Sequence, residues 1–219
     1  MVRKSFTSLL FLFITYGLQP LAWADGLQSL ENFVRTVSSG RADFTQVVTA
    51  PAREGQAARS KTSSGTFEFA RPGRFRFMYR KPFEQTIVAD GQTLWLYDVD
   101  LNQVTARKQS SVLGSTPAAL IAAAPDLRAL QAEFSLESAP GKDGLEWLVA
   151  TPKSREGQLQ SVRVGFKGSA SAPSLSVLEI LDSFGQRSVL TFDHVDINPG
   201  LPASTFQFKP PAGSDVVRQ

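Results

Sequence analysis

Short runs of alternating or clustered apolar and aromatic residues recur along most of the chain, and they limit its possible folds more than any other feature. They occupy residues 41–50, 66–70, 74–79, 85–90, 93–98, 103–107, 130–137, 145–152, 160–166, 175–181, 187–195 and 205–208. Turn-forming sequences such as Asp90-Gly91 and 182–186 (DSFGQ) separate them. This pattern predicts a mainly β protein with some helix, built as an antiparallel sheet, a sandwich or an open barrel.

Some of the predicted strands are apolar on both faces. In residues 93–98 (TLWLYD), Leu94 and Leu96 share one face and Trp95 and Tyr97 share the other, because side chains alternate along a strand. A strand of this kind has to be covered on both sides.

Two segments have helical patterns, and we expect them to be the only covers. Residues 25–39 carry an apolar stripe of Leu27, Leu30, Val34 and Val37. Residues 110–131 contain Pro117 at a first helical position, then the apolar run 119–124 (ALIAAA) and a break at Pro125.

Residues 1–24 have the parts of a secretory signal peptide. A short basic region (Arg3 and Lys4) precedes an apolar centre, and Ala-Trp-Ala precedes the expected cleavage site after Ala24. The remaining residues, 25–219, are expected to form a single domain. Without Arg3 and Lys4 the chain has 21 basic and 20 acidic residues, so its charge does not indicate a nucleic-acid partner.

Residues with the spacing needed for catalysis or metal binding are scarce. The chain has no cysteine and a single histidine, His194, so neither a thiolate site nor a multi-histidine site is expected. No G-x-S-x-G sequence marks a hydrolase nucleophile, and no glycine-rich loop marks a phosphate site. We therefore expect a protein that is not an enzyme and that uses no metal and no cofactor.

One cation shares a strand face with aromatic residues. Arg71 has the parity of Phe67 and Phe69, and Pro72 after it favours an extended backbone. A charge that faces an apolar interior is costly unless it is paired or hydrogen-bonded. Arg71 therefore either turns out to water or binds a group inside. Composition alone leaves open whether that interior is a packed core or a ligand cavity.

Five motifs follow one another along the chain. They are DFTQ (43–46), the G-x-F-x-F-x-R-P-x-x-F run (65–75), DGQTLWLYD (90–98), TPAALI (116–121) and FQFKPPAGSDVV (206–217). In this order they resemble the periplasmic outer-membrane lipoprotein carrier family, of the LolA type. The resemblance implies an incomplete (open) antiparallel barrel, covered by a helical lid and with a hydrophobic cavity inside.

The resemblance also implies a function and partners. Members of the family are periplasmic chaperones that bind the acyl chains of lipoproteins released from the inner membrane by an ABC transporter. They deliver this cargo to an outer-membrane receptor, or directly to the outer membrane. The alternative function is a related periplasmic carrier or sensor of another acylated lipid, such as a glycolipid or a pigment precursor.

Individual residues take roles from the same resemblance. Arg71 would bond to the lid and hold it closed, and residues 116–124, with Pro117, Leu120 and Ile121, would form that lid. The candidates for the acyl-chain cavity in the sheet are Phe67, Phe69, Phe75, Phe77, Leu94 and Leu96. For each of these, an ordinary core position is the competing interpretation.

Overall fold

The computed structural model describes residues 25–52, 57–112, 126–155 and 157–219. Its helices are α1 (Gly26–Thr36), α2 (Gln109–Val112), α3 (Leu127–Glu133) and the 3-10 helix η3 (Ala203–Phe206). Its strands are β1 (Ser39–Thr49), β2 (Ser60–Ala70), β3 (Arg74–Lys81), β4 (Gln85–Asp90), β5 (Thr93–Asp98), β6 (Gln103–Lys108), β7 (Phe134–Lys142), β8 (Leu145–Pro152), β9 (Leu159–Lys167), β10 (Ser174–Asp182), β11 (Arg187–Ile197) and β12 (Asp215–Arg218).

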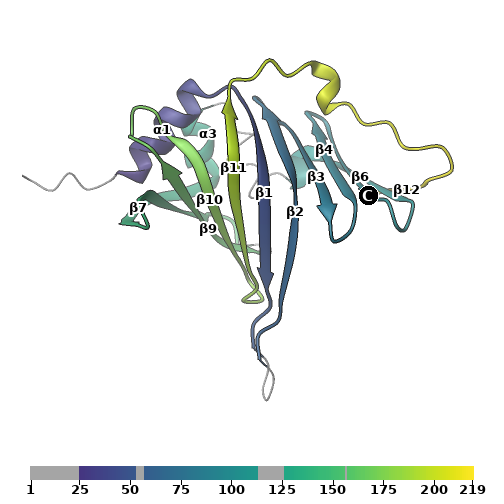
Figure 1. Ribbon diagram of the computed structural model, residues 1–219, viewed down its shortest axis with the longest axis horizontal. Helices are drawn as coiled ribbons and strands as arrows, with labels where there is room; N and C mark the ends of the chain where they lie inside the picture. Colours follow the sequence, from purple (N-terminus) through teal and green to yellow (C-terminus); the bar gives the residue numbers. More distant parts are fainter. Residues whose placement is uncertain (1–24, 53–56, 113–125, 156) are drawn as a thin grey trace, which may run out of the picture.

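All twelve strands form one sheet, in the order β12-β6-β5-β4-β3-β2-β1-β11-β10-β9-β8-β7. Strands β1 to β6 form one antiparallel meander and β7 to β11 form another, and the β1–β11 pairing joins the two. Strand β12 runs parallel to β6. Because β7 and β12 end the order without pairing to each other, the sheet stays open (Figure 1). The predicted fold class, a mainly β protein with an incomplete antiparallel barrel, is confirmed.

Helix α1 lies with α3 against the β7–β9 end of the sheet (Figure 1). Its start is set by Asp25, whose carboxylate accepts hydrogen bonds from the backbone N–H groups of Leu27 and Gln28. The helix is shorter than the predicted 25–39, because Val37 is already extended and β1 begins at Ser39. Pairing with the neighbouring strands replaces the last expected helical turn.

The main core lies between α1 and the concave face of the sheet. The ring centre of Phe33, on α1, lies 6.2 Å from that of Phe69 and 5.4 Å from that of Phe166. Phe67 stacks on Phe77 with ring centres 4.4 Å apart. Each large side chain buried in this way stabilises the fold by about 1.5–3 kcal/mol relative to its exposed state.

The convex face is covered differently from the expectation. The C-terminal segment, drawn in yellow in Figure 1, crosses the β3–β6 half before it ends as β12. Phe206 is buried, and the ring of Phe208 lies 5.6 Å from that of Trp95 and 6.1 Å from that of Tyr97. The expectation that residues 25–39 and 110–131 are the only covers is therefore wrong, because this segment shields the second apolar face of β5.

Three predicted element boundaries also change. Residues 130–133 belong to α3, because Asp126 caps that helix by accepting a hydrogen bond from the Ala129 N–H, and the strand starts only at Phe134. Residues 205–208 do not form a strand; η3 ends at Phe206. The short strand β12 was not predicted. The helix expected after Pro117 lies outside the described residues.

Candidate functional site

An apolar cavity of about 220 Å³, here called the apolar chamber, lies on the concave face. It is lined by Gln46 of β1, Phe75, Phe77 and Tyr79 of β3, Ile87 of β4, Leu94 and Leu96 of β5, Leu178 and Ile180 of β10 and Leu190 of β11. These side chains share the concave face because they occupy alternate positions on their strands. Both meanders contribute walls, so the chamber depends on the curvature of the whole sheet.

The six predicted cavity residues divide into two groups. Phe75, Phe77, Leu94 and Leu96 line the apolar chamber. Phe67 and Phe69 are buried nearer α1 and border a void of only about 20 Å³. That space is comparable to a single water molecule. Phe67 and Phe69 are therefore packed core residues next to the chamber, and Phe67 stacks on the chamber residue Phe77.

Arg71 faces inward from the turn that follows β2. Its backbone N–H donates to the carbonyl oxygen of Ser38 at 2.8 Å, and its Nε donates to the carbonyl oxygen of Val37 at 2.9 Å. The guanidinium carbon lies 5.5 Å from the ring centre of Phe33 and 5.6 Å from that of Phe69. Burial lowers the pKa of Arg71 to about 10, so the group keeps its charge at neutral pH.

The inward position of Arg71 decides between the two orientations that its sequence allows. The guanidinium does not turn out to water, and it binds the backbone at the end of α1. The predicted lid residues Pro117, Leu120 and Ile121 lie outside the described residues, so the latch between Arg71 and the lid stays a prediction.

Two polar side chains, Gln46 and Tyr79, lie at the end of the apolar chamber that borders the next pocket. The hydroxyl of Tyr79 donates to Oε1 of Gln46 at 3.0 Å, and Nε2 of Gln46 donates to Oγ of Ser188 at 2.7 Å. Beyond Tyr79 and Gln46 lies a larger, more open pocket of about 700 Å³, here called the vestibule, which these two residues also line. Sequence reasoning missed both residues. Their parity with Phe44 and Phe77 was the available signal.

The described residues offer no arrangement for catalysis at a metal. Within them, no group of three or more His, Cys, Asp or Glu side chains could hold a metal ion. His194 lies on the outer surface, where its Nδ1 is 3.0 Å from Oδ2 of Asp43. Among the same residues no helix is long and apolar enough to cross a membrane.

Comparisons with known proteins give one answer. The family model of the outer membrane lipoprotein carrier protein LolA matches residues 35–209. The outer-membrane lipoprotein carrier protein of Albidiferax ferrireducens is 75% identical over 199 residues, which cover 91% of this chain and 93% of that protein. The protein of the same name from Leptothrix cholodnii is 50% identical over 203 residues, which cover 93% of this chain and 90% of that protein.

A solved structure with a similar fold has little sequence identity to this chain. An uncharacterized conserved protein from Thermus thermophilus superposes with a TM-score of 0.52 at 14% identity, covering 89% of this chain and 97% of that chain. This likeness supports the fold alone, whereas the family match extends over most of the sequence. The chain therefore belongs to the LolA family of outer-membrane lipoprotein carrier proteins.

Proposed function

We propose that this protein is a periplasmic carrier of lipoproteins and that the apolar chamber holds acyl chains of the cargo during transfer to the outer membrane. The observation that carries the proposal is the combination of family membership with a chamber walled almost entirely by Phe, Leu and Ile side chains. The carrier is not an enzyme; it shields its cargo from water and releases it unchanged.

The free energies involved explain why a carrier is needed. Each buried methylene is worth about 0.8 kcal/mol, so an acyl chain of about fifteen methylenes costs on the order of 12 kcal/mol to expose. A lipoprotein with several chains would not cross the aqueous periplasm uncovered. The chamber offers apolar surface on the concave side of the sheet, where acyl chains can be withdrawn from water.

The chamber is small for this task as it stands. Its volume of about 220 Å³ lies below the roughly 300–1,000 Å³ of typical small-molecule sites. Entry of a full acyl chain therefore requires the concave side to widen. We infer that Arg71 opposes this widening, since it bonds the end of α1 to the turn after β2, and that it also holds the lid of residues 116–124.

The remaining parts of the pathway are proposed from the family resemblance. We infer that the signal peptide is cleaved after Ala24, that an inner-membrane ABC transporter supplies the cargo, and that an outer-membrane receptor or the outer membrane itself accepts it. The N-terminal sequence supports the cleavage, and the name of the relatives, outer-membrane lipoprotein carrier protein, supports lipoprotein cargo bound for the outer membrane. The transporter and the receptor are inferred from the family resemblance alone.

The proposal is tested by competition with a membrane. The mature chain is mixed with lipid vesicles that contain a synthetic triacylated lipopeptide, the vesicles are sedimented, and lipopeptide in the supernatant is measured. We expect a soluble complex with the wild type and at least about a tenfold loss with Leu96→Glu, because that carboxylate would point into an apolar chamber.

The matched control is Phe184→Glu, which introduces the same charge. Phe184 is 69% exposed and lines neither the apolar chamber nor the vestibule. The Phe184→Glu variant should extract lipopeptide as well as the wild type does. Retention of full extraction by a folded Leu96→Glu variant, with its melting temperature checked, would refute acyl binding in the chamber.

A further inference from the structure

The concave side changes from apolar to polar over two neighbouring levels of the sheet. Five residues, here called the polar belt, mark this change: Gln46 of β1, Ser63 of β2, Tyr79 of β3, Gln85 of β4 and Asp98 of β5. Tyr79 pairs with Gln85, and Gln85 pairs with Asp98, whereas Gln46 and Ser63 pair with each other one step further along, because Tyr79 itself pairs with Gly65. The hydrogen bond from the Tyr79 hydroxyl to Gln46 joins the two levels.

One pairing step toward the other end of these strands, the same face is apolar. Two residues before Tyr79 and Asp98 on their strands stand Phe77 and Leu96, and Ile87 pairs with both. All three line the apolar chamber, whereas all members of the polar belt line the vestibule. The belt is therefore a sharp boundary, with hydrocarbon-like walls on one side and a solvent-connected pocket on the other.

The belt presents hydrogen-bonding groups at this boundary. Tyr79 is held in place by its ring, whose centre lies 5.0 Å from that of Phe44 in an edge-to-face arrangement. Its hydroxyl donates to Gln46, and burial raises its pKa to about 12, so it remains a neutral donor at physiological pH. The amide of Gln46 has two N–H groups, of which Ser188 accepts one.

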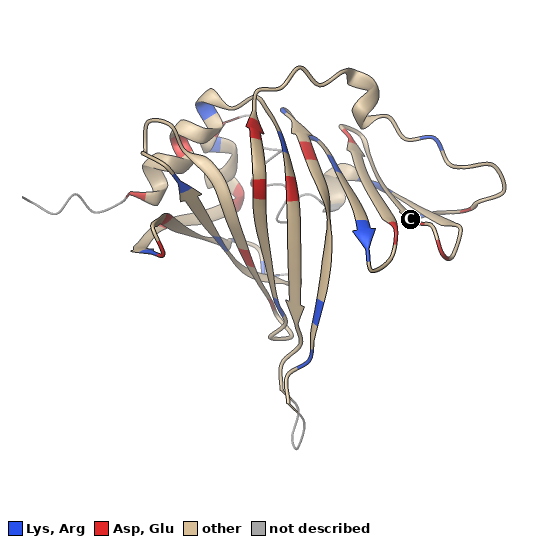
Figure 2. Cartoon of the chain, viewed as in Figure 1, with Lys and Arg blue, Asp and Glu red and all other residues tan. Residues whose placement is uncertain are grey.

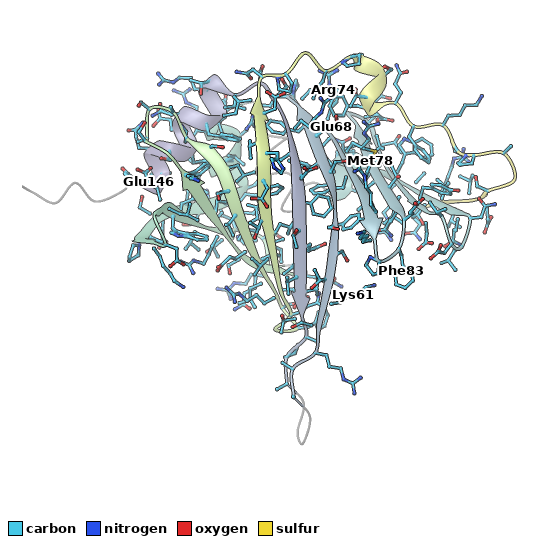
Figure 3. All side chains as sticks on the ribbon, in the orientation of Figure 1. Lys61, Glu68, Arg74, Met78, Phe83 and Glu146 are labelled. Atoms are coloured by element: carbon cyan, nitrogen blue, oxygen red, sulfur yellow. The ribbon has the colours of Figure 1, made fainter. Side chains whose placement is uncertain are left out.

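The vestibule beyond the belt suits a peptide better than a charged lipid headgroup. It carries cations (Arg59 and Lys61) and anions (Asp98 and Asp100) together. Phe83 borders it with 58% exposure, and the ammonium group of Lys61 lies 4.9 Å from its ring centre. Figure 3 places Lys61 and Phe83 toward the lower end of the sheet, away from Glu68 and Arg74. Figure 2 shows both signs of charge around this end.

We propose that the polar belt binds the carbonyl-bearing head of the cargo, where acyl chains are esterified to the modified first residue. The acyl chains then point from the belt toward Phe75 and Leu94, and the peptide leaves through the vestibule. The inference rests on the proposed function and adds the orientation of the cargo within the carrier. Ester and amide carbonyl oxygens accept hydrogen bonds. Gln46 offers the N–H that Ser188 does not use, and the Tyr79 hydroxyl donates to the cargo by exchanging its bond to Oε1 of Gln46 for one to a carbonyl oxygen.

The belt and Arg71 occupy opposite ends of β2. Ser63 belongs to the belt, and Arg71 follows the other end of the strand. At about 3.3 Å per residue, eight positions span about 26 Å. The head of the cargo and the proposed latch therefore act on different ends of the acyl chains.

The first experiment compares two lipopeptides that differ only in carbonyl groups. Both carry two sixteen-carbon chains on a glyceryl-cysteine peptide, one through esters and one through ethers, and their dissociation constants are measured with the mature chain. We expect the wild type to prefer the ester form. Tyr79→Phe should weaken ester binding by about threefold to tenfold, the effect of one neutral hydrogen bond, and leave ether binding unchanged.

Tyr97→Phe is the matched control, because it removes the same hydroxyl from the opposite face of the sheet, where that group donates to Asn102. It should bind both lipopeptides like the wild type. Equal affinity of the wild type for the two forms, or an equal loss of both with Tyr79→Phe, would overturn the inference and leave the carrier function intact. Failure of the wild type to bind either form would overturn the carrier function as well.

The second experiment reads the direction of the cargo from cross-links. A photoreactive diazirine is placed either at the glyceryl end or at the chain terminus, and the cross-linked peptides are identified by mass spectrometry. The glyceryl label should react with β1, β2 and β4 near Gln46, Ser63 and Gln85. The chain-end label should react near Phe75 and Leu94. The reverse assignment would refute the proposed direction.

Discussion

Glu68 and Arg71 lie three positions apart but act on different faces of the sheet. Arg71 binds the end of α1 on the inside. Glu68 lies on the outside, where its side chain is only 5% exposed and bonds Arg41 at 2.8 Å and Arg76 at 2.5 Å. Burial alone would raise the pKa of Glu68, but the hydrogen bonds from Arg76 and Arg41 outweigh burial and hold the pKa below its ordinary value.

Replacement of Arg71 by leucine should separate uptake of cargo from its release. The variant keeps the apolar walls, so it should still extract lipopeptide from vesicles. Transfer to acceptor vesicles should slow, because the closed state loses the charge-assisted hydrogen bond from Arg71 to the carbonyl oxygen of Val37. Transfer rates are measured with fluorescent lipopeptide. Arg218→Leu, an exposed arginine at the end of β12, should transfer normally. Equal transfer rates for Arg71→Leu and the wild type would refute the proposed latch.

Glu68→Gln should destabilise the fold at neutral pH and not in acid. The folded state holds the carboxylate with a depressed pKa, so its contribution is present above the ordinary pKa of 4.5 and is lost as the pH falls through the folded-state pKa. We expect a loss of about 1–3 kcal/mol at pH 7. Urea unfolding from pH 7 down to pH 3 measures it.

The gap between wild type and Glu68→Gln should narrow steadily below pH 4.5. Glu84→Gln, which alters an exposed carboxylate in the β3–β4 turn, serves as the control and should change stability little at any pH. A gap that stays constant with pH would show that the ion-paired cluster around Glu68 does not depend on its charge.

At the level of elements, the C-terminal segment has a larger role than its lack of regular structure suggests. Helix η3 packs against β3 and β4, and the guanidinium of Arg74 lies 5.7 Å from the ring centre of Phe206. Phe208 then covers Trp95 and Tyr97. This segment makes a second, smaller core on the convex face, so β5 is covered on both faces and its residues are half-buried.

Phe206→Ala should therefore lower the free energy of unfolding as much as truncation of a phenylalanine in the main core does. Phe206 is 2% exposed, and truncation of a buried phenylalanine typically costs about 3–5 kcal/mol. Guanidinium unfolding should show a lower midpoint with an unchanged slope. Phe184→Ala, at a site that is 69% exposed, should shift the midpoint very little. A small effect of Phe206→Ala would mean that the segment is not an integral part of the fold.

How far the sequence predicts these elements depends on their periodicity. Strand β3 alternates clearly and β5 is a short apolar run that follows an Asp-Gly turn, and the predicted ranges 74–79 and 93–98 agree with them closely. Strand β12 has only four residues and no hairpin signal, so nothing in its sequence predicts it. The role of the C-terminal segment was missed because local patterns do not show which distant face an aromatic residue will cover.

The site shows the same limit. The alternation places Phe67, Phe69, Phe75 and Phe77 on one face, but which of them border a cavity depends on where α1 packs. Gln46 and Tyr79 share that face too. They were not predicted because a polar residue near a strand end is usually solvated. The strand register places Gln46 one pairing step from Tyr79, and only the hydrogen bond between their side chains joins the polar belt.

For the whole molecule, the open sheet explains how a chamber of about 220 Å³ could admit larger cargo. Strands β7 and β12 end the sheet unpaired with each other, so the outer edges of the two meanders can move apart while the β1–β11 ladder that joins them stays intact. The contacts that must yield join the α1 region to the β1–β6 half, where Phe33 packs against Phe69 and Arg71 bonds the carbonyl oxygen of Val37. Central strands keep their hydrogen bonds during this movement.

Binding should accordingly loosen one region while others stay protected. With a triacylated lipopeptide, amide hydrogen exchange measured by mass spectrometry should accelerate in α1 and α3, and β1, β2 and β11 should remain slow. A monoacylated lipopeptide should produce a smaller change. Uniform protection by both ligands would contradict widening and would indicate a chamber of fixed size.

The pairing of β1 with β11 also has a consequence for how the chain acquires its structure. In this pairing Phe44 lies opposite Phe192, far away in the chain. The pairings within each meander, in contrast, join strands that follow one another in the sequence. Closing so long a loop is entropically costly and slow compared with forming local hairpins. The two halves therefore form first and meet late. Until they pair, the apolar concave faces of both meanders are exposed to water, which makes the newly exported chain prone to aggregation.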